Sequence, residues 1–288
     1  MAEWVYEGKD ESGEEGEGEG IGSKVEDDSP RLRQIGGLWI LTSNTSIVPV
    51  GEALHFGSSA RLDLEQEDLT SAPAPIGLAS PSTGLGYWIL FEDGLIESMG
   101  AVIGFEIPGT HESKAVAIAP NYRGDGLYVA FADGSISTLG TAIYHGSAIE
   151  MGLESPIVSI ATSRDGYLML CENGKVVNFG EAPFHGSVYE SVESHQAKAV
   201  DIVSHSSGDG YWILLENGFV IANGRCVFYG RPEELSCKAV SILASPDGEG
   251  YWIVDENGGV HGQGHVTVLP GRNEIPEGAG VAISAALA

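Results

Sequence analysis

Residues 210 to 218 read Gly210-Tyr211-Trp212-Ile213-Leu214-Leu215-Glu216-Asn217-Gly218. An aromatic and apolar run that ends at Asn-Gly is typical of a β-strand followed by a hairpin turn, because Asn and Gly supply the two positive φ values of a type I′ turn. The run is apolar throughout and does not alternate with polar residues, which indicates a strand covered on both faces. We therefore predict a hairpin within a sheet that lies between two similar neighbours.

This pattern recurs along the chain, and each copy ends at a glycine. The glycines lie roughly 40 to 50 residues apart, which is the length of one propeller blade. A turn pair follows the run in five copies, whereas the first copy has Asn44-Thr45, for which we expect a looser turn. The six runs are Leu38-Trp39-Ile40-Leu41, Tyr87-Trp88-Ile89-Leu90, Leu127-Tyr128-Val129-Ala130, Tyr167-Leu168-Met169-Leu170, Tyr211-Trp212-Ile213-Leu214 and Tyr251-Trp252-Ile253-Val254, and the closing glycines are Gly51, Gly100, Gly140, Gly180, Gly224 and Gly264.

A second apolar strand precedes five of the six copies, but residues 24–30 ahead of Trp39 are too acidic to form one. The missing strand recurs at the C-terminus, where residues 280–285 include Ile283. We predict an all-β fold, a six-bladed β-propeller over residues 37–288 in which the C-terminal strand completes the first blade. Its expected structural residues are Trp39, Trp88, Trp212, Trp252 and Ile283.

Residues 1–36 differ from the rest in composition. Residues 1–30 hold 11 acidic side chains against two lysines, so they cannot bury enough apolar area to fold alone. We predict an acidic N-terminal arm with two open interpretations. Either Trp4 and Tyr6 anchor it on a neighbouring subunit, or it is a solubilising tail without a partner.

The whole chain is strongly acidic, with 41 Asp and Glu against 14 Lys and Arg, a formal net charge of −27 and a pI near 4.4. Such a surface repels phosphate backbones and anionic bilayers, so we expect no nucleic-acid partner and no membrane insertion. The N-terminus has neither a basic nor an apolar region of an export signal. The three cysteines form no metal-binding pair, and whether Cys226 and Cys237 pair depends on the fold.

Candidate binding residues are few. His55, His145 and His185 recur near one place in their copies, but on different blades, so we expect packing roles, no metal and no cofactor. The innermost strands offer Ser159, Asp201 and Ser241 among Ala, Val, Ile and Leu, and no cluster of acids, histidines or arginines, which predicts a protein that is not an enzyme. The aromatic residues Tyr144, Phe184 and Phe228 stand at comparable positions and could either bind sugars or pack between blades.

The end of each copy carries a resemblance. Residues 179–187, Phe179-Gly180-Glu181-Ala182-Pro183-Phe184-His185-Gly186-Ser187, fit a Phe-Gly-x-Ala-x-Phe-x-Gly-Ser tail behind the Gly-Tyr-Trp run, and residues 139–147 follow it closely. Over residues 37–288 the chain resembles the Gly-Tyr-Trp propeller-like repeat family of actinobacterial surface proteins and of the phages that infect such hosts. The resemblance implies the propeller architecture.

For function, the resemblance, the acidity and the missing export signal favour a non-catalytic binding or assembly module. Within that class we expect a phage virion protein, which is tail-associated, receptor-binding or capsid-decorating and whose partners are other virion subunits. The main alternative is a lectin-like propeller at a bacterial cell surface that binds a host-surface glycan. The third alternative is a propeller hydrolase.

Overall fold

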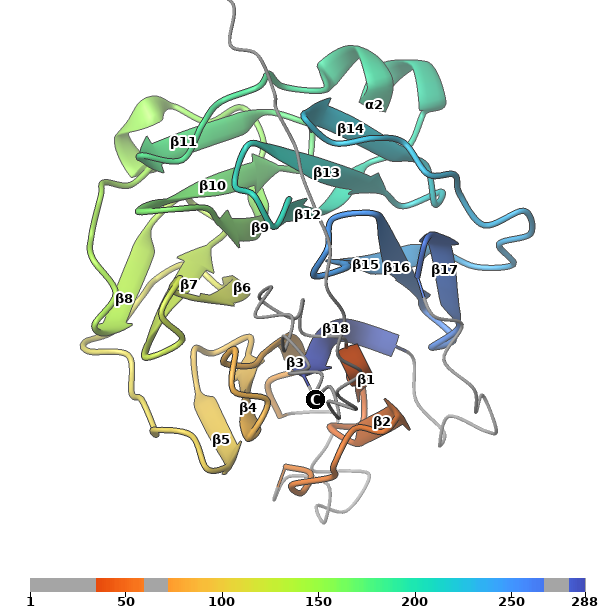
Figure 1. Ribbon diagram of the computed structural model, residues 1–288. Helices are drawn as coiled ribbons and strands as arrows, with labels where there is room; N and C mark the ends of the chain where they lie inside the picture. Colours follow the sequence, from red (N-terminus) through yellow and green to blue (C-terminus); the bar gives the residue numbers. More distant parts are fainter. Residues whose placement is uncertain (1–34, 60–71, 267–279, 288) are drawn as a thin grey trace, which may run out of the picture. The chain divides into compact units, whose positions relative to one another are not determined.

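The computed structural model describes residues 35–59, 72–266 and 280–287. Residues 1–34 of the predicted arm, with Trp4 and Tyr6, lie outside these residues, whereas its last two residues, 35 and 36, belong to the first strand of the propeller. The described residues form six three-stranded antiparallel sheets, which are arranged as blades around a common centre in Figure 1. The predicted all-β, six-bladed propeller is confirmed.

Each blade has an inner, a middle and an outer strand. Each inner strand packs against the inner strands of both neighbouring blades, so the ring is closed. Within the described ranges, two short helices, η2 (Ile149–Met151) and α2 (Tyr189–His195), lie in connections between blades. From inner to outer strand, the blades are β18 (Gly280–Leu287), β1 (Ile35–Thr42), β2 (Ile47–Gly51); β3 (Pro75–Ala79), β4 (Gly86–Phe91), β5 (Ile96–Gly100); β6 (Ala115–Pro120), β7 (Gly126–Phe131), β8 (Ile136–Gly140); β9 (Ile157–Thr162), β10 (Gly166–Cys171), β11 (Val176–Gly180); β12 (Ala199–Ser204), β13 (Gly210–Leu215), β14 (Val220–Gly224); and β15 (Ala239–Ala244), β16 (Gly250–Asp255), β17 (Val260–Gly264).

The first blade joins the two ends of the propeller. Strand β18 pairs antiparallel with β1, with Ile283 opposite Ile40 and Ser284 opposite Trp39. Ile283 is buried, and β18 also packs against β15 and β3 on either side. The predicted closure by the C-terminal strand is therefore confirmed.

The middle strands form the core between blades. From β4 to β16 each of them is buried along its whole length, as their unbroken apolar runs predict. Trp39, Trp88 and Trp212 are at most 1% exposed and Trp252 is 4% exposed. Their predicted structural role is confirmed.

Backbone hydrogen bonds also join successive blades. In five of the six junctions, the first residue of an inner strand donates its N–H to a carbonyl at the end of the preceding middle strand. At the remaining junction β3 begins with Pro75, which has no N–H to donate. The bonds are Ala115 to Glu92 (3.1 Å), Ile157 to Ala132 (3.0 Å), Ala199 to Glu172 (3.0 Å), Ala239 to Glu216 (2.9 Å) and Gly280 to Glu256 (2.7 Å).

The hairpin turns differ from the predicted type I′. Gly94 has a φ of 87°, but none of the Asp and Asn residues in the turn pairs has a positive φ. Gly94 N–H bonds to Phe91 carbonyl (2.9 Å) and Phe91 N–H to Leu95 carbonyl (2.9 Å), which is a type I turn followed by a glycine in the left-handed region. The side chain of Asp93 accepts the N–H of Leu95 at 3.1 Å, so the acidic residue serves as a local acceptor.

The turn of the first blade follows the same geometry, so the predicted looser turn is wrong. Thr45 takes the place of the glycine, with a φ of 69°, and its N–H bonds to the Thr42 carbonyl at 2.9 Å. Thr45 is buried, and its hydroxyl has no hydrogen-bond partner among the residues that the structure describes. A β-branched residue in the left-handed region is strained by about 1–2 kcal/mol.

Replacing Thr45 by glycine should stabilise the protein by about 1 kcal/mol, because it removes this strain and a buried unpaired hydroxyl. Chemical denaturation of both proteins measures the difference. The matched control is Gly94→Thr, which places the same side chain at a φ of 87° in the second blade and should destabilise it. A destabilised Thr45→Gly protein would mean that the Thr45 methyl group contributes more through packing than its backbone strain costs.

Candidate functional site: the blade rim and the central channel

Three predicted binding residues lie on the outer rim. Tyr144, Phe184 and Phe228 follow the outer strands β8, β11 and β14, and they are 59%, 51% and 48% exposed. They belong to three successive blades and therefore do not form one pocket. Phe228 stacks on Phe219 with ring centroids 5.7 Å apart, whereas the exposure of the three side chains argues against blade packing as their main role.

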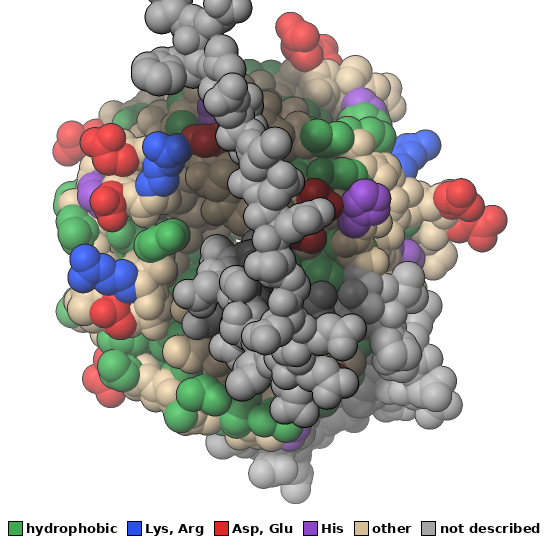
Figure 2. All heavy atoms as spheres, in the orientation of Figure 1, with side chains coloured by type: hydrophobic (Ala, Val, Ile, Leu, Met, Phe, Trp, Pro, Cys, Tyr) green, Lys and Arg blue, Asp and Glu red, His purple; other side chains and the backbone are tan. Residues whose placement is uncertain are grey.

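A second row of exposed apolar residues lies directly before them, and sequence reasoning missed it. We define a rim connector as the seven residues after each outer-strand glycine: 52–58, 101–107, 141–147, 181–187 and 225–231. The third residue of a connector is an exposed aliphatic residue in four blades. These residues are Leu54, Ile103, Ile143 and Val227, which are 55 to 66% exposed. In Figure 2, hydrophobic side chains lie along the periphery of the face shown, interspersed with acidic ones.

In three blades, a tryptophan of the middle strand fixes this third residue. The indole N–H of Trp39 donates to the Leu54 carbonyl at 2.8 Å, that of Trp88 to Ile103 at 2.7 Å, and that of Trp212 to Val227 at 2.8 Å. The indole thus binds the backbone carbonyl of the third connector residue from inside the blade. The side chain of the same residue is consequently left at the surface.

The tyrosine of the next blade holds the other end of the connector. Tyr211 donates its hydroxyl proton to the Gly186 carbonyl at 2.7 Å and accepts the His185 N–H at 3.1 Å. Tyr87, Tyr167 and Tyr251 contact Gly57, Gly146 and Gly230 in the same way. Burial raises the pKa of Tyr167 and of Tyr251 to about 12, so both remain donors at neutral pH.

The repeated histidines belong to this packing. The His145 and His185 rings lie 5.9 and 6.0 Å from the Tyr167 and Tyr211 rings of the following blades. His55 stands one place earlier in its connector, where its Nε2 lies 3.5 Å from the Ser58 hydroxyl. Within the described residues, no group of three or more His, Cys, Asp or Glu is placed to hold a metal.

The inner strands line a cavity of about 370 Å³ at the centre of the ring. The second residue of every inner strand is β-branched and partly exposed, and the pairing register with the middle strand shifts at that residue in every blade. The result is a collar of six similar side chains, which we call the valine collar. Its members are Ile76, Val116, Val158, Val200, Val240 and Val281.

A polar cluster adjoins the collar on three neighbouring blades. Asp201 of β12 accepts hydrogen bonds from the hydroxyls of Ser159 (2.6 Å) and Ser241 (2.8 Å) and from the N–H groups of Ile202 and Ile242 (both 2.9 Å). Burial raises the pKa of the Asp201 carboxyl, and the four hydrogen bonds offset this only in part. Ser159, Asp201 and Ser241, the inner-strand polar residues named from the sequence, therefore lie in one hydrogen-bonded cluster.

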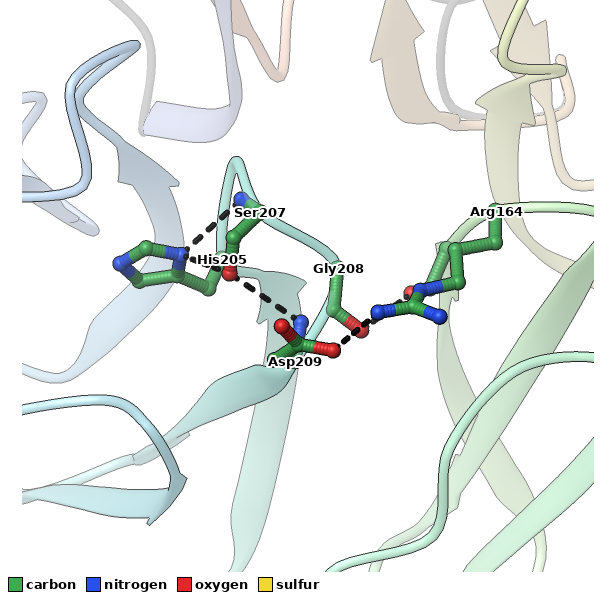
Figure 3. Close-up of polar contacts among 6 residues, drawn as sticks. Arg164, His205, Ser207, Gly208 and Asp209 are labelled. Atoms are coloured by element: carbon green, nitrogen blue, oxygen red, sulfur yellow. Dashed lines mark hydrogen bonds and ion pairs between the residues drawn. The ribbon is translucent and has the colours of Figure 1, made fainter.

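Loops between inner and middle strands meet on one face, as Figure 3 shows. Arg164 of the fourth blade forms an ion pair with Asp209 of the fifth, and the Ser163 hydroxyl donates to the Gly208 carbonyl at 3.1 Å. His205 Nδ1 accepts the Ser207 N–H at 3.0 Å in the same loop. These side chains bond to one another and join two blades, so we assign them a structural role.

The three cysteines are free, which answers whether Cys226 and Cys237 pair: they do not. Cys171 is buried, as its place in an apolar run predicts. No helix in the described part of the chain has the length and apolar character needed to cross a membrane.

No protein-family model and no curated protein matches this sequence. Among solved structures, the chain is similar to one in the crystal structure of a nidogen/laminin complex, with 10% identity over 87% of this chain and 98% of that one and a TM-score of 0.52. It is also similar to the β-propeller domain of Cps50 (Swd1) from Myceliophteria thermophila, at 11% identity, 65% and 64% coverage and a TM-score of 0.44. A chain of a mitotic checkpoint complex has 10% identity, 63% and 60% coverage and a TM-score of 0.43. The chain thus spans less than two thirds of the last two, and such identities establish likeness of fold alone.

Replacing Trp212 by alanine should lower the free energy of unfolding by about 3–5 kcal/mol, because it leaves a cavity in a fully buried strand. Trp212→Phe should cost less, since it retains most of the ring but leaves the Val227 carbonyl without its indole donor. Urea denaturation separates the two contributions. An unchanged stability of Trp212→Ala would contradict the burial seen here.

Asp201→Asn should change stability in a pH-dependent way. Because the folded-state pKa of Asp201 is raised, the folded protein binds more protons than the unfolded chain between the unfolded pKa, about 3.9, and the folded value. The stability advantage of the wild type over Asp201→Asn should therefore shrink as the pH rises from about 4 through that window. Urea midpoints at several pH values measure the difference, and an advantage that grows with pH would mean that the hydrogen bonds outweigh burial.

Proposed function

We propose that the chain is a non-catalytic binding or assembly module whose contact surface is the blade rim. The observation that carries this is the outward placement of apolar side chains at equivalent positions of successive blades. Exposed apolar patches of this kind mark surfaces that meet another molecule. Because the chain carries a strong negative charge, we expect the surface that it contacts to be neutral or cationic.

Within that class, the function we favour is a structural protein of a phage virion, either tail-associated, receptor-binding or capsid-decorating. The support is the family resemblance of residues 37–288 and the exposed apolar residues that recur along the rim, which suit a subunit held among other subunits. Its localisation would then be the virion, after synthesis in the host cytoplasm.

One observation favours a second candidate, a carbohydrate-binding propeller at a bacterial surface. The fourth connector residue is aromatic in three successive blades, at Tyr144, Phe184 and Phe228, and exposed aromatic faces stack on sugar rings. A hydrolase is disfavoured, because the residues lining the channel include one carboxyl and no histidine or arginine.

The test is a rim variant that combines Tyr144→Ser, Phe184→Ser and Phe228→Ser. These side chains are largely exposed, so the fold should persist while incorporation into virions, measured by mass spectrometry of purified particles, falls at least tenfold. The matched control is Leu85→Ser with Tyr122→Ser, two exposed apolar residues in loops between inner and middle strands.

The outcomes separate the two candidates. Absence of the wild-type protein from virions together with rim-dependent signals on a glycan array would support the sugar-binding module. Normal behaviour of the rim variant in both assays would overturn the rim as the contact surface.

A further inference from the structure

The central cavity holds an acid that has no counter-ion among the described residues. Asp201 is the one charged residue among those that line it, and all four of its hydrogen-bond donors are neutral, two hydroxyls and two backbone N–H groups. The net effect of burial is unfavourable to the charged carboxylate. A cation that entered the cavity would supply the positive charge that the described lining residues do not provide.

The two serines leave the cluster able to accept hydrogen bonds from a ligand but not to donate them. Ser159 and Ser241, which are 5% and 8% exposed, both commit their hydroxyl protons to Asp201 when it is ionised. Their remaining capacity is as acceptors, since a hydroxyl has one proton and two lone pairs, and Ser159 uses part of it for a long bond from the Ile202 N–H at 3.4 Å. The cluster therefore favours a ligand group that only donates hydrogen bonds and carries positive charge.

An acidic vestibule lies against the same three blades. It is a cavity of about 320 Å³ that shares Val158, Val200 and Val240 with the channel. Its charged residues are three acids and two lysines, and the lysines are already used: Lys198 pairs with Glu172 at 2.8 Å and Lys238 with Glu216 at 2.7 Å. Glu256 accepts the Lys238 backbone N–H at 3.4 Å and forms no ion pair within the described residues.

We propose that the central channel binds a small aliphatic ammonium ion. The ammonium group lies against Ser159, Asp201 and Ser241, and the alkyl part lies against the valine collar. The cavity of about 370 Å³ falls within the usual range of small-molecule sites, which combine apolar walls with a few polar groups. The vestibule and the charge of −27 draw cations toward the opening, because low-dielectric walls focus the field of like charges.

The test uses three probes of matched size: n-butylammonium, n-butanol and butyrate. The full-length protein, labelled with ¹⁵N, is titrated with each at neutral pH, and the amide signals of Ile202 and Ile242 report on the Asp201 carboxylate. We expect saturable shifts with n-butylammonium, at least about tenfold weaker binding of n-butanol, and none of butyrate. Equal binding of the amine and the alcohol, or no saturable shift with the amine, would overturn the proposal.

Two variants test the charges separately. Asp201→Asn should weaken n-butylammonium binding at least about tenfold while leaving n-butanol unchanged. Glu256→Gln, which lies in the vestibule and outside the cluster, should weaken it about twofold to threefold at low salt and have no effect at about 1 M salt. If Asp201→Asn does not fold, the wild-type comparison of amine and alcohol and the Glu256→Gln titration decide the question. Unchanged amine affinity in a folded Asp201→Asn protein would show that Asp201 only joins blades.

Discussion

The rim connector, held at both ends by buried aromatic donors, is the element on which the rest of this propeller depends. The connectors after the first and fifth blades receive an indole N–H from their own blade and a phenol O–H from the next blade, as at Val227 with Trp212 and Gly230 with Tyr251. The other described connectors receive at least one of these two bonds. Successive sheets share few backbone bonds, so these contacts set how one blade lies against the next. The glycine ahead of the pair completes the arrangement, because a Cβ on Gly210 would lie 2.5 Å from the Asn223 carbonyl oxygen. Each residue of the Gly-Tyr-Trp triplet thus has its own role: the glycine avoids a steric clash, the tyrosine donates to the connector of the preceding blade, and the tryptophan donates to the connector of its own blade.

Where a blade departs from the triplet, the connector keeps at least one of its two hydrogen bonds. In the third blade, Tyr128 replaces the tryptophan, and its hydroxyl reaches the Ile143 carbonyl at 3.1 Å, so the donor changes while the acceptor is kept. In the fourth blade, Leu168 provides no donor, and the third connector residue there is Pro183. That connector retains its bond from Tyr211. A junction therefore tolerates the loss of one of its two donors.

Much of this could be predicted from the sequence, because period, apolar runs and the misplaced C-terminal strand are properties of a linear pattern. The turn type could not, since Asp-Gly fits both the type I′ turn and the observed type I turn with a left-handed glycine. The two differ in the φ of the aspartate and in the backbone hydrogen bonds, which only the structure shows. The Asp201 cluster was visible only as three polar residues at one place in the repeat. Its bonds join three blades, and the repeat register alone did not show which neighbour each side chain reaches. The outward row at Leu54 and Ile103 was missed because the indole bonds to their carbonyls, which carry no sequence signal.

The hydrogen bonds to the connector carbonyls leave the side chains of the same residues free to vary. A backbone acceptor is the same for every residue type, so the third connector position can change its side chain without disturbing the blade junction. Leucine, isoleucine, valine and proline all occur there in this one chain. The fourth position is similarly variable, with His55, Gly104 and three aromatic residues. Stability and the recognition that we propose for the rim are therefore carried by different atoms of the same segment: backbone atoms hold the ring together, and side chains form the outer surface. If the rim is the contact surface, a repeat of this design can alter what it binds by substitutions there while every motif residue stays in place.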